Sequence, residues 1–126
     1  MIKCYHCGQT KPTSKFYVDR TKKSGYQSRC KDCGNLIKNV HRFNKNSGLS
    51  LSIEEYINSS GYTDDNCSIC GVEYSNNSTA TVKVLDHCHK TGKIRGFICS
   101  RCNLVMGHVG DNTEILDKIK KYLTTD

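Results

Sequence analysis

Residues 85–103 read LDHCHKTGKIRGFICSRCN, and they hold the most informative motifs of the chain. It opens on an Asp-His pair and closes on a Cys-x2-Cys-Asn motif. Two thiolates at this spacing project from a tight turn with a bite that suits a tetrahedral metal ion. The Thr91-Gly92 pair between the two motifs is typical of a turn, so the flanking residues are predicted to form a β-hairpin. The stretch therefore predicts a short hairpin that ends in a metal-binding turn.

The other cysteines repeat this spacing. Nine cysteines occur in 126 residues, and eight of them form four Cys-x2-Cys pairs, which leaves Cys88 over. Disulfides are the alternative to metal binding, but no apolar secretory segment follows Met1, so we expect a reducing cytoplasmic compartment and zinc. Pairing along the sequence predicts two structural zinc ions. Their ligands would be Cys4, Cys7, Cys30 and Cys33 at the first site, and Cys67, Cys70, Cys99 and Cys102 at the second.

The composition predicts small units that metal ions, rather than a large apolar core, hold together. Hydrophobic residues make up 36% of the chain and tryptophan is absent. One short domain or two smaller ones fit this length. No apolar run approaches the roughly 18 residues that a membrane span needs, so we expect no membrane role. The expected fold class is small α+β, stabilised by zinc.

Positive charge is concentrated in the first part of the chain. The formal net charge is +7, and residues 1–47 hold 11 of the 19 Lys and Arg residues but 2 of the 12 Asp and Glu residues. Such a surface attracts the phosphates of nucleic acids, although a solvated lysine-rich surface is the plain alternative. We therefore predict a basic DNA-binding module at residues 1–47 and a separate chemical domain at residues 48–126.

The first half is predicted to form a zinc ribbon followed by helices. A hairpin over residues 16–26 would connect the first two cysteine pairs. Apolar residues at helical spacing predict a basic helix over residues 35–44. Farther on, Ser52 and Glu55 form the pattern of a capping box, so a helix of about eight residues is expected before Gly61.

The second half is predicted to form the hairpin and two more helices. The strands are expected at residues 82–85 and 94–99. A helix should begin at residues 100–102 and end at Gly107 or Gly110. The closing helix should follow the capping residues Asp111-Asn112 and present an apolar face of Ile115, Leu116, Ile119 and Leu123.

Polar side chains of the opening stretch suit the hydrolysis of a phosphodiester. Asp86 and Asn103 offer hard oxygen ligands of the kind that Mg²⁺ prefers. A neutral His87 could take a proton from water as general base, and an extended backbone would place His89 on the same face. Asn103 directly follows Cys102, so the zinc would fix its position relative to the hairpin. Singly, each residue would more commonly have a structural role, but together they predict a catalytic site.

At these residues the sequence resembles the recombination endonuclease VII family, within the wider HNH or ββα-metal nucleases. The resemblance covers roughly residues 50–126. Cys88 stands where many relatives have an acidic residue, and Met106 stands where the junction-resolving type has Glu. The shared pattern consists of a Cys-x2-Cys pair, Asp86-His87-Cys88-His89, Thr91-Gly92, Arg95-Gly96 and a second Cys-x2-Cys pair followed by Asn103.

The resemblance implies a DNA endonuclease whose ββα-metal (HNH) finger has flanking helices and an N-terminal zinc ribbon. Asp86 and Asn103 would bind one catalytic Mg²⁺ or Mn²⁺, in addition to the two structural zinc ions. His87 would act as general base and His89 as its catalytic partner. Arg95 would either contact a phosphate or buttress the hairpin. A phage source is implied, and with it action in the cytoplasm of a bacterial host cell.

These observations predict a Mg²⁺-dependent endonuclease that binds DNA through its backbone phosphates. One site per chain implies nicking of duplex or branched DNA, and a homodimer or two successive nicks would be needed to cut both strands. The alternative is a non-catalytic zinc module that binds nucleic acid or serves as an adaptor. RNA is a further candidate target. His89 could also replace a cysteine as a zinc ligand.

Overall fold

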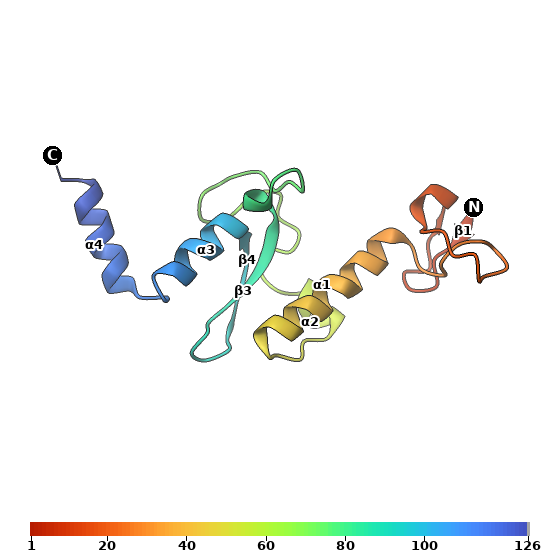
Figure 1. Ribbon diagram of the computed structural model, residues 1–126, viewed down its shortest axis with the longest axis horizontal. Helices are drawn as coiled ribbons and strands as arrows, with labels where there is room; N and C mark the ends of the chain where they lie inside the picture. Colours follow the sequence, from red (N-terminus) through yellow and green to blue (C-terminus); the bar gives the residue numbers. More distant parts are fainter. Residues whose placement is uncertain (126) are drawn as a thin grey trace. The chain divides into compact units, whose positions relative to one another are not determined.

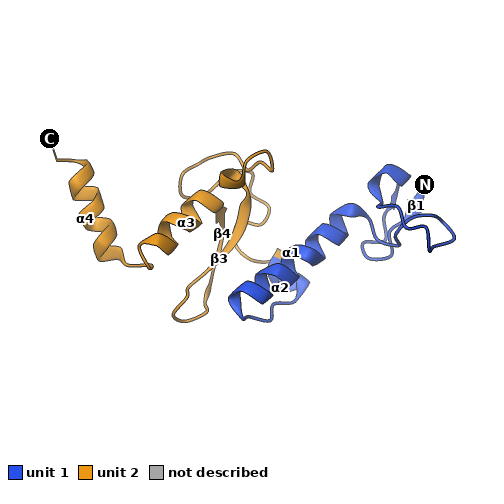
Figure 2. Cartoon of the chain, in the orientation of Figure 1, with its two compact units in different colours: residues 1–56 blue, residues 57–126 orange. Residues whose placement is uncertain are grey.

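The chain forms two compact units. The computed structural model describes residues 1–125. Unit 1 is Met1–Tyr56 and unit 2 is Ile57–Asp126 (Figures 1 and 2). The division falls downstream of the 47/48 boundary expected from the charge distribution. Each unit combines one two-stranded sheet with short helices, which confirms the small α+β class.

The helices and strands are short, as expected for units of this size. Unit 1 contains β1 (Ile2–Lys3), β2 (Thr10–Lys11), the 3-10 helix η1 (Thr13–Lys15), α1 (Lys31–Ser47) and α2 (Ile53–Ile57), the last residue of which belongs to unit 2. Unit 2 contains the 3-10 helix η2 (Thr79–Thr81), β3 (Lys83–His87), β4 (Ile94–Cys99), α3 (Ser100–His108) and α4 (Thr113–Leu123).

The sheet of unit 1 lies around the first cysteine pair, where β1 and β2 pair antiparallel. The hairpin predicted over residues 16–26 is reduced to an isolated bridge between Val18 and Tyr26. At its tip the Asp19 carboxylate accepts hydrogen bonds from both the backbone N–H and the hydroxyl of Thr21. Such local bonds compete with a strand ladder, so the segment turns instead of extending.

Helix α1 is longer than the apolar pattern predicts. It begins directly after Cys30 and ends at Gly48, whose φ of 75° is left-handed and whose N–H bonds to the carbonyl of Asn44. The predicted range of 35–44 covers only the centre, because the polar residues at both ends carry no periodic apolar signal. A glycine in this conformation is the common end of an α-helix.

The capping box at the start of α2 is confirmed. The Glu55 N–H donates to Ser52 Oγ at 3.0 Å, and the Ser52 N–H donates to Glu55 Oε1 at 3.1 Å. The helix itself ends at Ile57 and is therefore shorter than the expected eight residues. Tyr56 on α2 is buried and packs edge-on against Phe43 of α1, with ring centroids 6.2 Å apart.

Unit 2 contains the predicted hairpin and both predicted helices. β4 has the predicted bounds, whereas β3 continues past residue 85 to His87. α3 begins at Ser100 and ends at His108, just beyond one of the two predicted end points. α4 follows the expected cap, but it has no buried residue. Among the described residues, no helix is long and apolar enough to cross a membrane.

The buried cores of the units are small and contain the cysteines. In unit 1, Cys4, Phe16, Cys30 and Cys33 are buried together. In unit 2, the corresponding cluster is Cys67, Ile98 and Cys99, with Tyr74 and Met106 among the partly buried residues packed against it. The other buried apolar residues are few, and zinc bound at the two clusters would add to the stability of both units.

Candidate metal centres and catalytic site

The eight paired cysteines form two clusters whose geometry fits zinc. Within each cluster the four sulfur atoms lie within 4.8 Å of one another. A tetrahedral ion with Zn–S bonds of about 2.3 Å would separate its sulfur ligands by roughly 3.8 Å. The sulfurs of Cys4 and Cys33 are 3.8 Å apart and those of Cys70 and Cys99 are 3.6 Å apart. All nine cysteines are free in the structure, and the tetrahedral spacing of the sulfurs favours zinc over disulfides.

The thiolate form, which is the metal ligand, is favoured at one buried cysteine of each cluster. Burial raises the pKa of Cys4, but backbone N–H groups of Cys7 and Cys30 that donate to its sulfur outweigh burial and lower the pKa to about 6. The pKa of Cys67 is lowered to about 6 for the same reason, with Cys99 N–H among the donors. The backbone thus prepares both clusters for a dication.

Cationic side chains add to this preparation at the rim of each cluster. Lys11 Nζ donates to Cys30 Sγ at 3.2 Å, and Arg101 Nη2 donates to Cys70 Sγ at 3.6 Å. Both contacts raise the pKa of the cationic group and favour a thiolate partner. Each cluster contains four sulfurs close enough to share one ion, so a tetrahedral site is complete without His89.

A β-bulge shapes the end of the hairpin. Asp86 pairs with Gly96 and His87 pairs with Ile94, so Arg95 is an extra residue on β4. In a regular ladder Arg95 would face His87, and its side chain would lie on the opposite side of the sheet from Asp86. A bulge bends its strand and re-aims the inserted side chain. Arg95 can therefore reach Asp86.

Asp86 is a buried carboxylate that Arg95 holds by both oxygens. Asp86 is 4% exposed. Arg95 Nε donates to its Oδ2 at 2.6 Å, and Arg95 Nη2 donates to its Oδ1 at 3.2 Å and to the carbonyl of His87 at 3.2 Å. The hydrogen bonds to Asp86 raise the pKa of Arg95. Each carboxylate oxygen keeps a second lone pair, so Asp86 remains able to bind a metal ion.

The two candidate catalytic histidines lie side by side. His87 ends β3, and His89 follows in the connecting loop. Their ring centroids are 4.7 Å apart and the ring planes are inclined by 44°. The side chain of His89 is 66% exposed, and its Nδ1 lies 3.5 Å from Asp111 Oδ2. The two imidazoles therefore lie together at the end of β3 and just beyond it, and His89 is open to solvent.

Asn103 is half-buried in the first turn of α3. This helix packs against both β3 and β4. Cys99 ends β4 and also caps α3, because its sulfur accepts the N–H of Cys102 at 3.4 Å. The second cysteine cluster thus fixes the angle between the hairpin and the helix that carries Asn103. Among the described residues no hydrogen bond joins Asn103 to Asp86, and their joint role as ligands stays a prediction.

Asp111 belongs to the same network, although its place in the sequence indicated only helix capping. The cap of α4 is Asn112, whose side chain accepts the N–H groups of Glu114 and Ile115. Asp111 Oδ1 instead accepts a hydrogen bond from Arg95 Nη2 at 3.1 Å, and this contact lowers the pKa of Asp111. One sequence signal could have indicated this role. Asp111 and Asn112 can both cap α4, but a helix needs only one N-cap, so the other side chain is available for a different contact.

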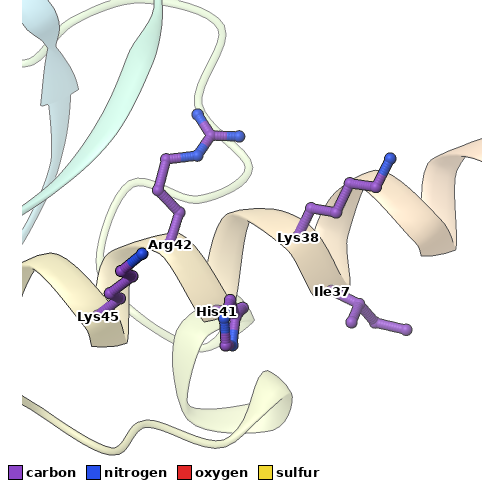
Figure 3. Close-up of a pocket in the computed structure, with 5 residues that line it drawn as sticks. All are labelled: Ile37, Lys38, His41, Arg42 and Lys45. Carbon is purple, nitrogen blue, oxygen red and sulfur yellow. The ribbon is translucent and has the colours of Figure 1, made fainter.

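Helix α1 presents a second cluster of interest in unit 1. Lys38, His41, Arg42 and Lys45 are exposed and line one pocket with Ile37 (Figure 3). We call these four polar residues the basic face of α1. Their spacing of three, four and seven residues places them on adjoining turns of one side of the helix. Within residues 1–125 none of the four forms an ion pair with a carboxylate, so the positive charges of Lys38, Arg42 and Lys45 are available to a partner.

Tyr17 supports the N-terminal end of this surface. Lys31 Nζ lies 5.1 Å and Lys38 Nζ lies 5.7 Å from the centroid of its ring. Both distances suit a cation–π contact. The ring therefore orients lysines, which leaves less of it free to stack on a base.

Comparison with known proteins agrees with the cysteine and Asp-His motifs. The model of the recombination endonuclease VII family matches residues 40–125. A solved ββα-Me type II restriction endonuclease, Hpy99I, is 27% identical, with a TM-score of 0.42, over 96% of this chain. The chain spans 63% of the length of that protein. No curated protein matches significantly. Because the family match covers more than half of the sequence, including the hairpin and the second cysteine cluster, the chain belongs to the recombination endonuclease VII family.

Proposed function

We propose that this protein is a metal-dependent endonuclease that hydrolyses phosphodiester bonds of DNA. One observation carries the proposal: a buried Asp86, clamped by Arg95, directly precedes His87 at the end of β3, and the rings of His87 and His89 lie together. Buried charge of this kind needs a compensating partner and is often found at functional sites. The chain belongs to the recombination endonuclease VII family, which is described as a family of endonucleases.

Asp86 and Asn103 are the proposed ligands of a catalytic Mg²⁺ or Mn²⁺. A carboxylate and a carboxamide oxygen are hard donors, and the free lone pairs of Asp86 fit such an ion. When bound, the ion would supply positive charge to the scissile phosphate. The four-sulfur clusters have no open position and are proposed as structural sites only.

The chain's own residues would carry the proton transfers. An imidazole nitrogen of His87 would take a proton from water as the water oxygen forms its bond to phosphorus and the bond to the 3′ oxygen breaks. The leaving oxygen would take a proton from solvent. His89 would help to position the phosphate. Arg95 would buttress Asp86 instead of contacting the phosphate, because its Nε and Nη2 already bind Asp86.

Unit 1 is proposed to hold the DNA. The basic face of α1 belongs to a helix of 17 residues, which is about 25 Å long. Unpaired cations along such a helix suit the regularly spaced phosphates of a duplex. With one site per chain, the expected product is a nick, and cleavage of both strands would need a homodimer or a second nick.

A plasmid assay tests the proposed activity. Zinc-loaded protein is incubated with supercoiled plasmid and Mg²⁺ or Mn²⁺, and the conversion to open circles is followed for wild type, His87→Ala and His108→Ala. His108 is an exposed histidine at the end of α3 and serves as the matched control. Losing the general base should slow nicking by about 100-fold or more, while His108→Ala should nick at the wild-type rate.

Parallel reactions with branched DNA, single-stranded DNA and RNA identify the preferred substrate. Equal rates for wild type and His87→Ala on every substrate would refute the proposal and leave a non-catalytic zinc module. Cleavage of RNA in preference to all DNA forms would reassign the substrate.

A further inference from the structure

We propose that Asp111 is a positioning residue of the active site: from the junction of α3 and α4 it holds Arg95 and His89, and through Arg95 it orients Asp86. The inference rests on the proposed function, because it assigns roles within the same site. Asp111 contacts Arg95 and His89, and it is not one of the proposed metal ligands. It acts through its two neighbours.

The backbone at Asp111 is fixed in an uncommon conformation. Its φ of 57° is left-handed, and Asp111 is the one residue other than glycine with a positive φ within residues 1–125. Its N–H bonds to the carbonyl of Met106 at 3.0 Å, while Asn112 caps the next helix. A left-handed conformation is unfavourable for residues with a Cβ, although Asp and Asn tolerate it better than most. Both helix ends therefore hold Asp111 in place.

This fixed backbone presents a carboxylate with two neighbours. One oxygen accepts Arg95 Nη2 at 3.1 Å, and the other lies 3.5 Å from His89 Nδ1. The side chain is 11% exposed. A largely buried carboxylate would be costly without such partners, so the contacts and the burial explain each other.

The contact with Arg95 completes a three-sided clamp. The guanidinium also binds Asp86 and the carbonyl of His87. Its planar fork makes these bonds in one orientation, and a further acceptor on Nη2 restricts the rotation of the fork. Asp111 should therefore limit how far the Asp86 carboxylate can turn.

The contact with His89 selects a proton position. A carboxylate near Nδ1 favours the tautomer with the proton on Nδ1, and the Nε2 lone pair is then free to accept a hydrogen bond. His89 is mostly exposed, and its ring also lies against the ring of His87. Asp111 is thus the group that gives this exposed ring a defined orientation.

The competing explanation is that Asp111 has only a structural role and links α3, α4 and the hairpin. Two substitutions separate the explanations while keeping the backbone acceptable. Asp111→Asn retains the shape and the tolerance for positive φ but removes the charge, and Asp111→Gly removes the side chain and relieves the backbone. Asp117→Asn is the control, because Asp117 is an exposed carboxylate on the neighbouring helix α4.

The readouts are the imidazole ¹⁵N shifts of His89, assigned by loss of its signals in His89→Gln, and the kcat and KM of plasmid nicking. Full-length, zinc-loaded protein is used throughout. Wild type and Asp117→Asn should show the Nδ1–H tautomer of His89. Both Asp111 variants should lose that preference, and their kcat should fall by about 10-fold or more with KM within about twofold.

Each result decides the inference. Retention of the Nδ1–H tautomer in both Asp111 variants, or its absence in wild type, overturns it. A kcat within about twofold of wild type also overturns it, since a structural role alone would change the melting temperature and leave kcat intact. If wild type nicks no substrate, the proposed function fails, and the tautomer measurement alone then decides whether Asp111 positions His89.

Discussion

Arg95 shows how one inserted residue alters what a sequence can reveal about a site. Strict alternation along β4 places its side chain away from Asp86, whereas the bulge brings the two together. The sequence therefore left two roles open for Arg95. The glycine that follows it was the available sign, because glycines often mark bulges. Motif spacing identified the candidate residues, but the contacts among them depend on backbone irregularities that spacing does not encode.

Gly96 should be intolerant of any side chain. Its φ is 136°, and a Cβ there would lie 2.9 Å from the carbonyl oxygen of Ser60. That oxygen accepts the N–H of Phe97 at 2.8 Å, so it is not free to move away. Gly96→Ala should lower the free energy of unfolding by about 1–3 kcal/mol, as measured by urea denaturation.

Gly107→Ala is the matched control for that measurement. Gly107 is helical, and a methyl group added to its Cα would meet nothing within 4 Å. Alanine in a helix should be neutral or stabilising by about 0.5–1 kcal/mol. Equal unfolding midpoints for the two variants would contradict the close approach at Gly96.

Among the helices and strands, the hairpin, α3 and α4 were predictable because residues typical of element ends flank each of them. The cysteine pair marks the end of β4, and Asn112 marks the start of α4. The segment at residues 16–26 lacked such signals and forms only an isolated bridge. The ends of α1 were missed for the related reason that polar helical residues show no apolar period.

The basic face of α1 should set the salt dependence of DNA binding. Replacing Lys38, Arg42 and Lys45 together by Gln should reduce the slope of log K against log salt by about 0.9 for each lost phosphate contact. Fluorescence anisotropy with labelled duplex, in a His87→Ala background that prevents cleavage, measures the slope.

The matched control removes the same charge from another helix. Lys118, Lys120 and Lys121 of α4 are exposed and can be changed to Gln in the same background. A larger change of slope in this control than in the α1 variant would show that unit 1 is not the principal DNA-binding surface.

For the whole molecule, the sequence predicted the cysteine clusters and the small apolar core, but it did not predict the long-range contacts between side chains. Cysteine spacing gave both clusters, and the composition showed that a large apolar core was out of reach. The contact between Asp111 and Arg95 joins residues 16 positions apart and depends on a left-handed residue, so no periodic pattern predicts it.

Removing zinc should unfold the protein. The apparent binding free energy of a structural zinc site is about 10–16 kcal/mol, which equals or exceeds the usual stability of a small domain. Native mass spectrometry should find two zinc ions in wild type and in Cys88→Ser, and one in Cys99→Ser, because Cys88 belongs to neither cluster. A strong chelator should abolish the dispersion of the NMR spectrum.

The dual place of Cys99, as the last residue of β4 and the cap of α3, has a consequence for how such a chain can evolve. A cysteine cluster that fits a metal ion joins the hairpin to α3, and Met106 of α3 packs against the same cluster. Apolar residues at other positions then do not have to preserve the angle between the hairpin and α3. Substitutions can therefore accumulate at these positions while the cysteines are retained. Related proteins with this fold should differ widely in their apolar residues and still align at the cysteines of the clusters.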